Sequence, residues 1–237
     1  MKKFIASMLV LSIILSFFTG MSAFATETTE STMTEAFEQL PDNAIVCYMF
    51  GQPVYKHEVR EDGFVDKDFN LGQNARISGS GATIPSNCRG KVITATATLT
   101  TTGYSQSEQA LYLPYANAIE MASDAESASS NASLVSMVSG ALGLATAPFA
   151  PYVSAASGTV SLLVSIYGFS RSTFAGEIRE HTDAGDNVVI DYVNSAYGRF
   201  YTVSSWDGLR CVKEGYTYDE TTVTVHSVYW AEGSVWG

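Results

Sequence analysis

The sequence predicts an α+β fold in which β-rich N-terminal and C-terminal segments flank a central apolar, Ala/Ser/Gly-rich helical hairpin. The stretch from Ser127 to Ser170 contains no Asp, Glu, Lys or Arg, and it is rich in small and aliphatic residues. Residues 91–103 alternate between apolar and threonine side chains, which is typical of a strand. Residues 183–237 are rich in aromatic and β-branched residues, which favour antiparallel sheets. These three observations together define the predicted class.

The N-terminus has the pattern of a secretory signal peptide over residues 1–25. Two lysines follow the first methionine, Phe4 to Phe18 is uncharged and mostly apolar, and Ala23-Phe24-Ala25 is a small-x-small cleavage pattern. A run of this length is short for a membrane span, which needs about 20 residues. We therefore expect a secreted, extracellular protein whose mature chain begins at Thr26.

The charge balance limits the classes of partner. The chain has 24 acidic and 13 basic residues and a formal net charge of −11, and loss of the two leader lysines would lower this charge further. The acidic residues are spread along the chain, so the phosphates of nucleic acids would be repelled and no nucleic-acid partner is expected. Any membrane contact would have to be hydrophobic, helped by low pH or guided by a receptor. An acidic surface also keeps a secreted protein soluble.

The N-terminal part of the mature chain is predicted to be a flexible lead-in (residues 26–43) followed by a β-rich segment (44–106). Residues 44–50 are typical of a buried strand that ends at Gln52-Pro53, and residues 54–59 are its expected partner. The strand at 91–103 is interpreted as a half-exposed antiparallel strand. Such alternation is also found in membrane-spanning strands of pore-forming barrels, which is the alternative left open.

A helical hairpin is predicted over residues 107–182, beginning near Ser107. Small side chains recur at steps of three and four, which allows two helix backbones to approach closely both in lipid and in soluble helix pairs. The stripe begins with Ala118, Ala122, Ala125, Ala128 and Ala132. The residues expected to form a membrane hairpin are Leu134, Val138, Ser139, Gly140, Gly143, Ala147, Pro148, Pro151, Ser154, Gly158, Ser161, Leu162 and Ser165.

Two interpretations of this hairpin remain open at the level of sequence. Residues 134–147 would reach about 21 Å as a helix, which is less than the roughly 30 Å of a hydrocarbon core. Residues 149–169 are long enough to span it, but their serines lower the hydrophobicity. The hairpin is therefore expected to be sheltered inside a soluble form, either as a permanent core or as a device that later enters a membrane.

The C-terminal segment, residues 183–237, is predicted to be an aromatic-rich antiparallel sheet. Its expected strands are 188–193, 199–204, 209–213 and 221–230, with turns between them. Aromatic side chains stabilise sheets through cross-strand pairs, but an exposed row could instead hold sugar rings or lie at a membrane interface. Trp206, Trp230 and Trp236 are the predicted surface-binding residues, and Trp206 and Trp236 are expected to be the most exposed.

The sequence predicts no catalytic residues and no cofactor. It contains no nucleophile elbow, zinc-protease motif, P-loop or dinucleotide-binding motif. The histidines are expected to be structural, and the combination of His57 with Cys47 or Cys88 as a thiol nucleophile has no support in the flanking residues. In an exported protein one pair among Cys47, Cys88 and Cys211 could form a disulfide. The alternative is that all three are buried as small apolar residues.

No metal site is predicted. The sequence Asp66-x-Asp68-x-Asn70 matches the first ligands of a calcium-binding EF-hand loop, but Leu71 and Ile77 replace the required glycine and glutamate. A looser calcium site near Asp66 remains as an alternative to a solvated acidic loop.

The layout of leader, sheltered Ala/Gly-rich hairpin and β-rich flanks is similar to that of secreted toxins and large bacteriocins. This resemblance is one of architecture and carries no motif. It implies a membrane-active protein whose hairpin inserts into a target membrane while the aromatic sheet contacts a surface component, with oligomers on the membrane compatible with the mechanism. The alternative is a non-catalytic extracellular module that binds glycan or protein, or is structural, and whose hairpin is its core.

Overall fold

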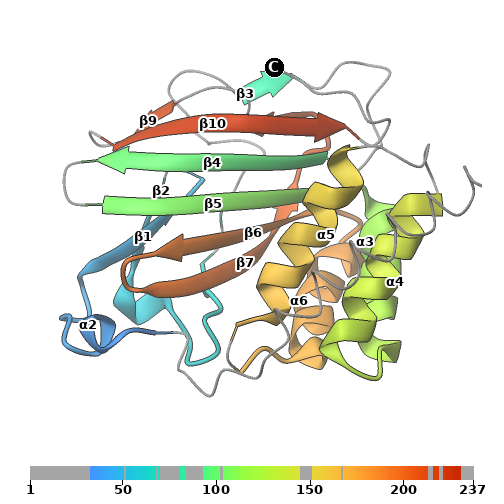
Figure 1. The fold of residues 1–237 in the computed structure, drawn as a ribbon, viewed down its shortest axis with the longest axis horizontal. Coiled ribbons are helices and arrows are strands. Elements are labelled where there is room, and N and C mark those ends of the chain that lie inside the picture. The colour runs from blue at the N-terminus through green and yellow to red at the C-terminus, as the bar shows by residue number, and fades with distance from the viewer. Residues whose placement is uncertain are drawn as a thin grey trace, which may run out of the picture. The chain divides into compact units, whose positions relative to one another are not determined.

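The computed structural model describes residues 33–50, 52–67, 69, 81–83, 93–101, 104–144, 151–166, 168–212, 216–218 and 221–230. Of these, the residues within 81–105 and 139–157 and those from 210 onward are described by their backbone alone. They belong to one compact unit, Ser31–Gly237. Helices and antiparallel sheets are both present, which confirms the α+β class (Figure 1). The expected leader, residues 1–25, lies outside the described residues.

A six-stranded antiparallel sheet with the order β7-β6-β5-β4-β10-β9 forms the centre of this unit (Figure 1). Its strands are β4 (Ile93–Thr101), β5 (Tyr104–Leu113), β6 (Asn187–Ser195), β7 (Gly198–Trp206), β9 (Tyr216–Tyr218) and β10 (Thr221–Trp230). The alternating segment forms β4, an inner strand that pairs with β5 and β10. The strands expected near 190 and 200 form the β6–β7 hairpin. A second small sheet pairs β3 (Gly81–Thr83) with β8 (Arg210–Val212).

Two assignments within the six-stranded sheet differ from the prediction. The helical hairpin was expected to begin near Ser107, but Tyr104–Leu113 is the strand β5, paired with β4 and β6. Its polar residues Gln106 and Glu108 lie on the same buried face as apolar neighbours. The sequence of β5 therefore lacks the alternation of apolar and polar residues by which a strand is predicted. Residues 216–220 were expected to be a turn, yet three of them form β9 and pair with β10.

Four helices occupy the segment in which a single hairpin was predicted: α3 (Tyr115–Ser127), α4 (Asn131–Leu144), α5 (Pro151–Val164) and α6 (Arg171–Asp183). Pro114 stands at the N-cap of α3 and separates it from β5. Helix α5 packs against β4, β5, β6 and β10, whereas α6 packs against β6 and β7 (Figure 1). The alanine stripe is buried along α3, which packs mainly against α6. Its last member, Ala132 in α4, is exposed.

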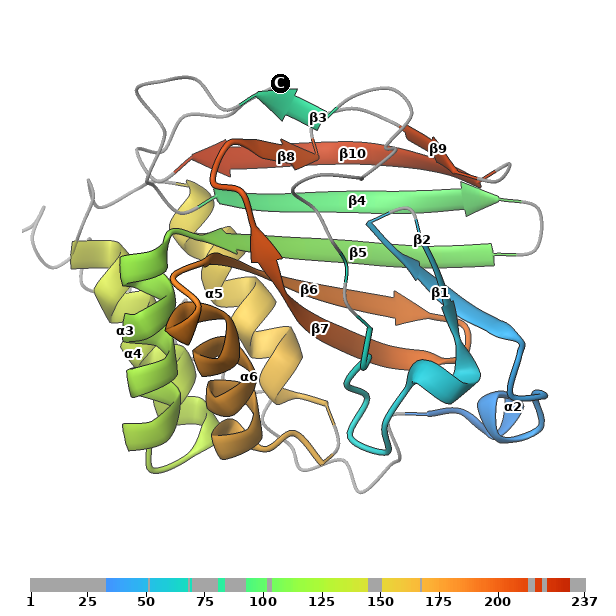
Figure 2. The same ribbon diagram turned by 180° about the vertical axis from the view of Figure 1, so that it is seen from behind.

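The hairpin of β1 (Ile45–Met49) and β2 (Gln52–Tyr55) lies against β5 and β6 on the other face of the sheet (Figure 2). Gln52 and Pro53 are part of β2 rather than the end of β1, because Gln52 already pairs with Met49 and Pro53 with Tyr48. The second strand is also shorter than expected, since residues 56–58 form the 3-10 turn η2 (Lys56–Glu58).

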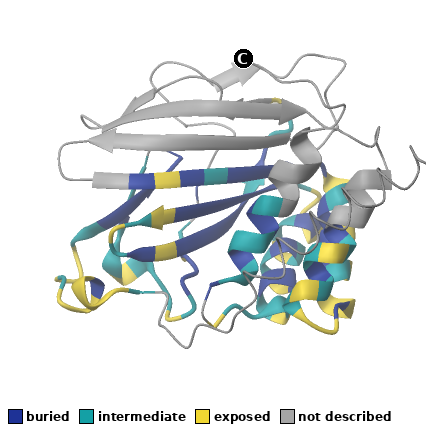
Figure 3. Cartoon of the chain, in the orientation of Figure 1, coloured by how far each residue is buried: buried dark blue, intermediate teal, exposed yellow. Residues whose placement is uncertain are grey.

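Buried side chains form two cores, one on each face of the sheet. Buried residues run through both the strands β5 to β7 and the helices that pack on them (Figure 3). The helix-side core joins sheet residues such as Leu111, Ile190 and Val203 to the buried residues of α3–α6. The hairpin-side core joins Tyr112 and Trp206 to the buried residues of β1 and β2. This separation follows from the two-residue period of a strand, which sends neighbouring side chains to opposite faces.

The predicted flexible lead-in is wrong from Met33 onward. Residues 35–38 form the short helix α2 (Glu35–Glu38), and the side chain of Thr34 accepts a hydrogen bond from the Phe37 amide at 3.3 Å. Phe37 is 5% exposed and its ring lies 5.9 Å from that of Phe200. Burial of this one aromatic side chain supplies the apolar contact that the polar sequence around it does not suggest.

Candidate functional site

The expected membrane hairpin corresponds to helices α4 and α5, called here the α4–α5 pair. Leu134 and Val138 of α4 are buried, as are Val160 and Leu163 of α5. All four belong to the helix-side core, which they share with residues of β5 and β6. In this structure the buried side chains of the pair therefore form part of the core of the domain.

The remaining hairpin residues fall into three groups. Gly158, Ser161, Leu162 and Ser165 are half-buried, and the Ser165 hydroxyl donates to the carbonyl of Leu162 at 2.7 Å just after α5 ends. Ser139, Gly140 and Gly143 lie in α4, while Pro151 and Ser154 lie in the first turns of α5, all described by backbone only. Ala147 and Pro148 lie outside the described residues.

The described polar contacts of the α4–α5 pair are neutral. The Asn131 amide donates to the carbonyl of Val164 at 3.2 Å and joins the start of α4 to the end of α5. The hydroxyl of Thr159 donates to Oε1 of Gln109 at 3.3 Å and joins α5 to the sheet. Because neither helix contains a charged residue, no ion pair holds the pair to its neighbours through the pair's own side chains.

Each helix of the pair has 14 residues. At a rise of about 1.5 Å per residue, a helix of this length extends over about 21 Å. None of the helices that the structure describes combines the length and the apolar character needed to cross a membrane.

The expected exposure of Trp206 is wrong. Its side chain is 4% exposed and its ring lies 5.2 Å from that of Tyr112, inside the hairpin-side core. Pairing with Asn187 at the end of the β6–β7 ladder places Trp206 on the face that the β1–β2 hairpin covers. Trp230 ends β10 and is described by its backbone, and Trp236 lies outside the described residues.

A buried pair of carboxyl groups, Glu108 and Asp191, was not predicted from the sequence. They lie on neighbouring strands, since Glu108 is opposite Val193 and Asp191 is opposite Ala110. This is a diagonal placement on one face, within reach of each other. Asp191 is 0% exposed and Glu108 is 4% exposed. Only the partner strand of the sheet brings the two acids together, so no spacing in the sequence could have revealed them.

Two side chains of β5, Glu108 and Gln106, also hold the β1–β2 hairpin in place. Oε1 of Glu108 accepts a hydrogen bond from the Phe50 amide at 2.9 Å. The Gln106 amide bonds both backbone groups of Tyr48, accepting from its N–H at 2.8 Å and donating to its carbonyl at 2.6 Å. Two side chains of the sheet therefore replace a neighbouring strand as partners for β1.

Burial makes a full charge on both acids costly. Burial first, and then the nearby Glu108 carboxyl, raise the pKa of Asp191 well above its ordinary value. Two carboxyl groups in one buried site favour a state in which one of them keeps its proton. Such pairs are used in acid–base catalysis, but β1 lies over this one, and the contacts described for Glu108 are those of a structural anchor.

Cys47 is a buried free thiol in β1, 0% exposed. Burial first, and then the carboxyl of Asp191, raise the pKa of this thiol well above its ordinary value. Since a nucleophilic cysteine requires the thiolate, the environment disfavours that chemistry. His57 is exposed, contacts the carbonyl of Asp42 through Nδ1 at 2.9 Å and stacks on the ring of Tyr55. Cys88 and the side chain of Cys211 lie outside the described residues.

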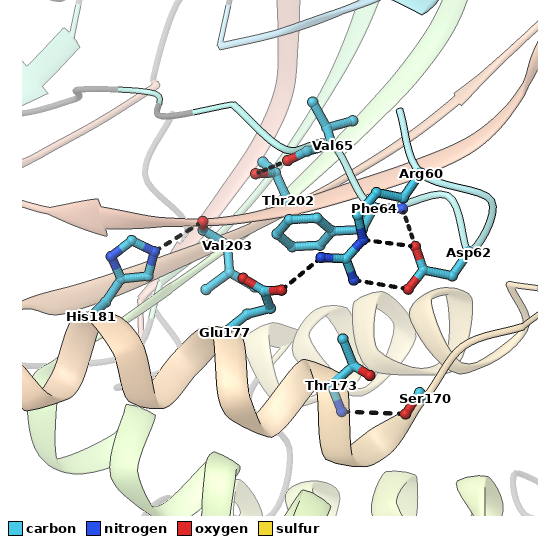
Figure 4. Close-up of polar contacts among 10 residues, drawn as sticks. All are labelled: Arg60, Asp62, Phe64, Val65, Ser170, Thr173, Glu177, His181, Thr202 and Val203. Atoms are coloured by element: carbon cyan, nitrogen blue, oxygen red, sulfur yellow. Dashed lines mark hydrogen bonds and ion pairs between the residues drawn. The ribbon is translucent and has the colours of Figure 1, made fainter. Parts of the chain in front are cut away.

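Arg60 is the centre of an ionic cluster that joins distant parts of the chain (Figure 4). Its guanidinium group contacts Asp62 at 3.0 Å and Glu177 of α6 at 2.9 Å, and it lies over the Phe64 ring with 4.3 Å to the centroid. Burial alone would lower the pKa of Arg60, but the hydrogen bonds to Asp62 and Glu177 outweigh it and raise that pKa.

Ser205, His181 and Asp186 also meet, at the end of α6. The Ser205 hydroxyl donates to Oδ2 of Asp186 at 2.7 Å and contacts Nδ1 of His181 at 3.0 Å, and Nε2 of His181 contacts the carbonyl of Val203 at 3.2 Å. In a catalytic triad the histidine accepts the serine proton and the acid orients the histidine. Here the acid binds the serine instead, so the contacts join α6 to β7.

Among the described residues, no group of three or more His, Cys, Asp and Glu side chains is arranged to hold a metal ion. Within the acidic loop considered for calcium, Asp62 is bound to Arg60 and Asp66 is exposed. Asp68 and Asn70 lie outside the described residues.

No family model matches the chain, and neither a curated protein nor a solved structure is detectably similar to it. Function is therefore argued from the α4–α5 pair and from the contacts that hold it.

Proposed function

We propose that the protein is a secreted, membrane-active protein of the bacteriocin or toxin type, in which the α4–α5 pair leaves the sheet and enters a target membrane. One observation carries the proposal: the charge-free stretch contains this pair, and the described contacts of the pair are apolar or neutral hydrogen bonds. Charged side chains are the most costly to place in a bilayer, at about 2.5–3.5 kcal/mol each at its centre. The pair carries none.

The main energetic cost of this transfer is the exposure of the sheet. Leu134, Val138 and Leu163 would exchange a protein core for lipid and remain away from water. The sheet face beneath them would lose its cover, and full exposure of a buried aliphatic side chain such as Leu111 costs about 1.5–3 kcal/mol. Membrane entry therefore requires binding that offsets this exposure, which a target surface component or oligomers on the membrane would supply.

Gly158 provides a sharp test, because an aspartate side chain there fits the folded protein but is costly to place in lipid. A Cβ added at Gly158 has no heavy atom within 4 Å, and the residue is only half-buried. We expect the Gly158→Asp variant to fold normally and to lose about 100-fold in membrane activity, the factor that corresponds to about 2.5–3.5 kcal/mol. Activity is measured as dye release from zwitterionic and anionic liposomes at pH 7 and pH 5.

Gly176 is the matched control. It is also a helical glycine with no heavy atom within 4 Å of an added Cβ, but it lies on α6, outside the pair. The Gly176→Asp variant should release dye as the unmodified protein does. Equal activity of the two variants, or no release by the unmodified protein under any condition, would count against insertion of the pair.

A second candidate is a non-catalytic extracellular module that binds a glycan or a protein. The observation in its favour is that the buried residues of the pair share one core with the sheet. In this case the pair never leaves the sheet and no liposome releases dye. Binding of labelled protein to intact cells or isolated wall polysaccharide, without leakage, is the result that this function predicts.

A further inference from the structure

A short segment of the chain, residues 60–66, lies against the turn that joins α5 to α6. An added Cβ at Gly63 would lie 3.3 Å from Cγ2 of Ile166, and an added Cβ at Gly168 would lie 3.7 Å from Cα of Asp62. Gly63 has φ +77° and would also meet the carbonyl oxygen of Arg199 at 2.7 Å. The segment and the turn are therefore in direct contact, and Gly63 permits the close approach. We call residues 60–66 the clasp.

The clasp is attached on both sides of this turn, and Figure 4 shows the side on which Arg60 bonds Glu177. On one side it bonds the outer edge of β7: the Val65 amide donates to the carbonyl of Tyr201 at 2.8 Å, and the Tyr201 amide donates to the carbonyl of Gly63 at 3.0 Å. On the other side Arg60 bonds Glu177 of α6 at 2.9 Å. The same guanidinium also bonds Asp62, which belongs to the clasp. The Arg60 side chain therefore links two residues of the clasp to each other and joins the clasp to α6.

The two ends of the α4–α5 pair meet beside this turn. The Asn131 amide binds the carbonyl of Val164, and Arg171 donates to the carbonyl of Ser129 at 3.5 Å. Phe169, in the turn, packs on Phe174 of α6 and on Tyr201 of β7, with ring centroids 5.4 and 5.8 Å apart. The pair thus joins the rest of the domain at one base, and the clasp covers part of that base.

We propose that the Arg60 clasp is the lock of the α4–α5 pair: while Arg60 bridges Asp62 and Glu177, the base turn is fixed and α5 stays on the sheet. This inference rests on the proposed function, since it names the element that regulates release of the pair. Gly168, with φ +78°, lies in the turn that would have to change its backbone angles. Loss of the Arg60 contacts frees this turn and lowers the barrier to membrane entry.

The other ion pairs among the described residues do not act on this turn. Lys67–Glu58 joins residues next to the β1–β2 hairpin, and Arg179–Glu126 joins α6 to α3. Arg179 therefore offers a matched control: it is an arginine on α6 whose bidentate partner lies in α3, and its loss should leave the base turn unchanged.

The test compares hydrogen exchange in Arg60→Met and Arg179→Met variants of the mature protein. Methionine keeps an apolar stem over the Phe64 ring and removes the charge. In Arg60→Met, amides of α5 should exchange about tenfold faster, the factor that corresponds to one charge-assisted hydrogen bond, while amides of α3 remain unchanged. In Arg179→Met, exchange in α5 should remain unchanged. The Glu177→Gln variant weakens only the contact between Arg60 and residue 177, so the amides of α5 should exchange at an intermediate rate. This variant replaces Arg60→Met in the test if Arg60→Met fails to fold.

Dye release from liposomes then separates the clasp from the proposed function. Faster exchange confined to the pair, with more dye release in Arg60→Met, supports both. Faster exchange in the pair with no release by any variant supports the clasp and removes the membrane function. Unchanged exchange in α5, equal acceleration in α3 and α5, or the same acceleration in Arg179→Met overturns the clasp whatever the liposomes show.

Discussion

The two helix pairs of this protein share one core but differ in the chemistry of their polar contacts. Helices α3 and α6 carry charges on their outer faces, and Arg179 of α6 forms a bidentate contact with Glu126 of α3 at 2.9 Å. The α4–α5 pair carries no charge, and the hydrogen bonds from Asn131 to Val164 and from Thr159 to Gln109 are between neutral groups. Its buried residues are nevertheless as fully covered as those of α6.

Burial and attachment are therefore separate properties of these helices. Apolar contacts are exchangeable, because lipid covers a leucine as well as a protein core does. Ionic contacts and hydrogen bonds to a fixed partner are specific to one neighbour and are lost on transfer. The α3–α6 pair is tied to the rest of the domain by contacts of this kind, such as Glu177 with Arg60 and His181 with the carbonyl of Val203. The α4–α5 pair has the hydrogen bond from Thr159 to Gln109, but it is held mainly by apolar contacts that a membrane could replace.

The largest expected effect tests whether both pairs are equally part of the core. Leu163 of α5 and Ile178 of α6 are each 0% exposed. Leu163→Asp and Ile178→Asp should each lower the free energy of unfolding by about 3–5 kcal/mol, since each buries an unpaired charge. Urea denaturation measures both. A mild loss for Leu163→Asp beside a severe one for Ile178→Asp would mean that α5 is loosely packed on the sheet.

A smaller effect concerns the sheet that carries both pairs. The raised pKa of Asp191 means that its contribution to stability is fully present below the unfolded pKa of about 3.9 and is lost as pH rises toward the folded pKa. The Asp191→Asn substitution removes this loss, and the side-chain amide of asparagine can donate a hydrogen bond to Glu108. It should raise the free energy of unfolding near pH 7 by about 1–3 kcal/mol and flatten its decline between pH 4 and pH 7.

Urea denaturation at pH 4.5 and pH 7.5 measures this change in the free energy of unfolding. Both helix pairs pack on β5 and β6, so the substitution should stabilise both pairs to the same extent. A variant that is less stable than the unmodified protein at pH 7.5 would show that the Asp191 carboxyl makes a favourable contact that asparagine cannot replace.

The smallest expected effect on stability concerns one glycine in α5 and one in α6. Gly158 and Gly176 both lie within helices, and an added Cβ at either meets no heavy atom within 4 Å. Gly158→Ala and Gly176→Ala should each stabilise the protein by about 0.5–1 kcal/mol, because alanine has less backbone freedom to lose. Thermal unfolding measures the gain. A gain for Gly176→Ala alone would indicate that α5 is not a stable helix in the free protein.

Features that rest on short-range pattern could be predicted from the sequence alone. Alternation of apolar and threonine residues marks β4, and runs of β-branched and aromatic residues between turns mark β6 and β7. Freedom from charge and spacing of small residues mark the helices α4 and α5. Each of these follows from residues within a few positions of one another, because the period of a strand or helix is a local property of the backbone.

Tertiary structure decided the features that depend on which face of which neighbour a residue meets. The strand β5 is a strand because β4 and β6 pair with it, and its Gln106 and Glu108 are buried because β1 supplies backbone partners. Trp206 is covered by a hairpin far away in the sequence. Arg60 meets Glu177 across 117 positions. Such contacts follow from the packing of whole elements, so the clasp and the buried acid pair, unlike the charge-free helices, could be found only in three dimensions.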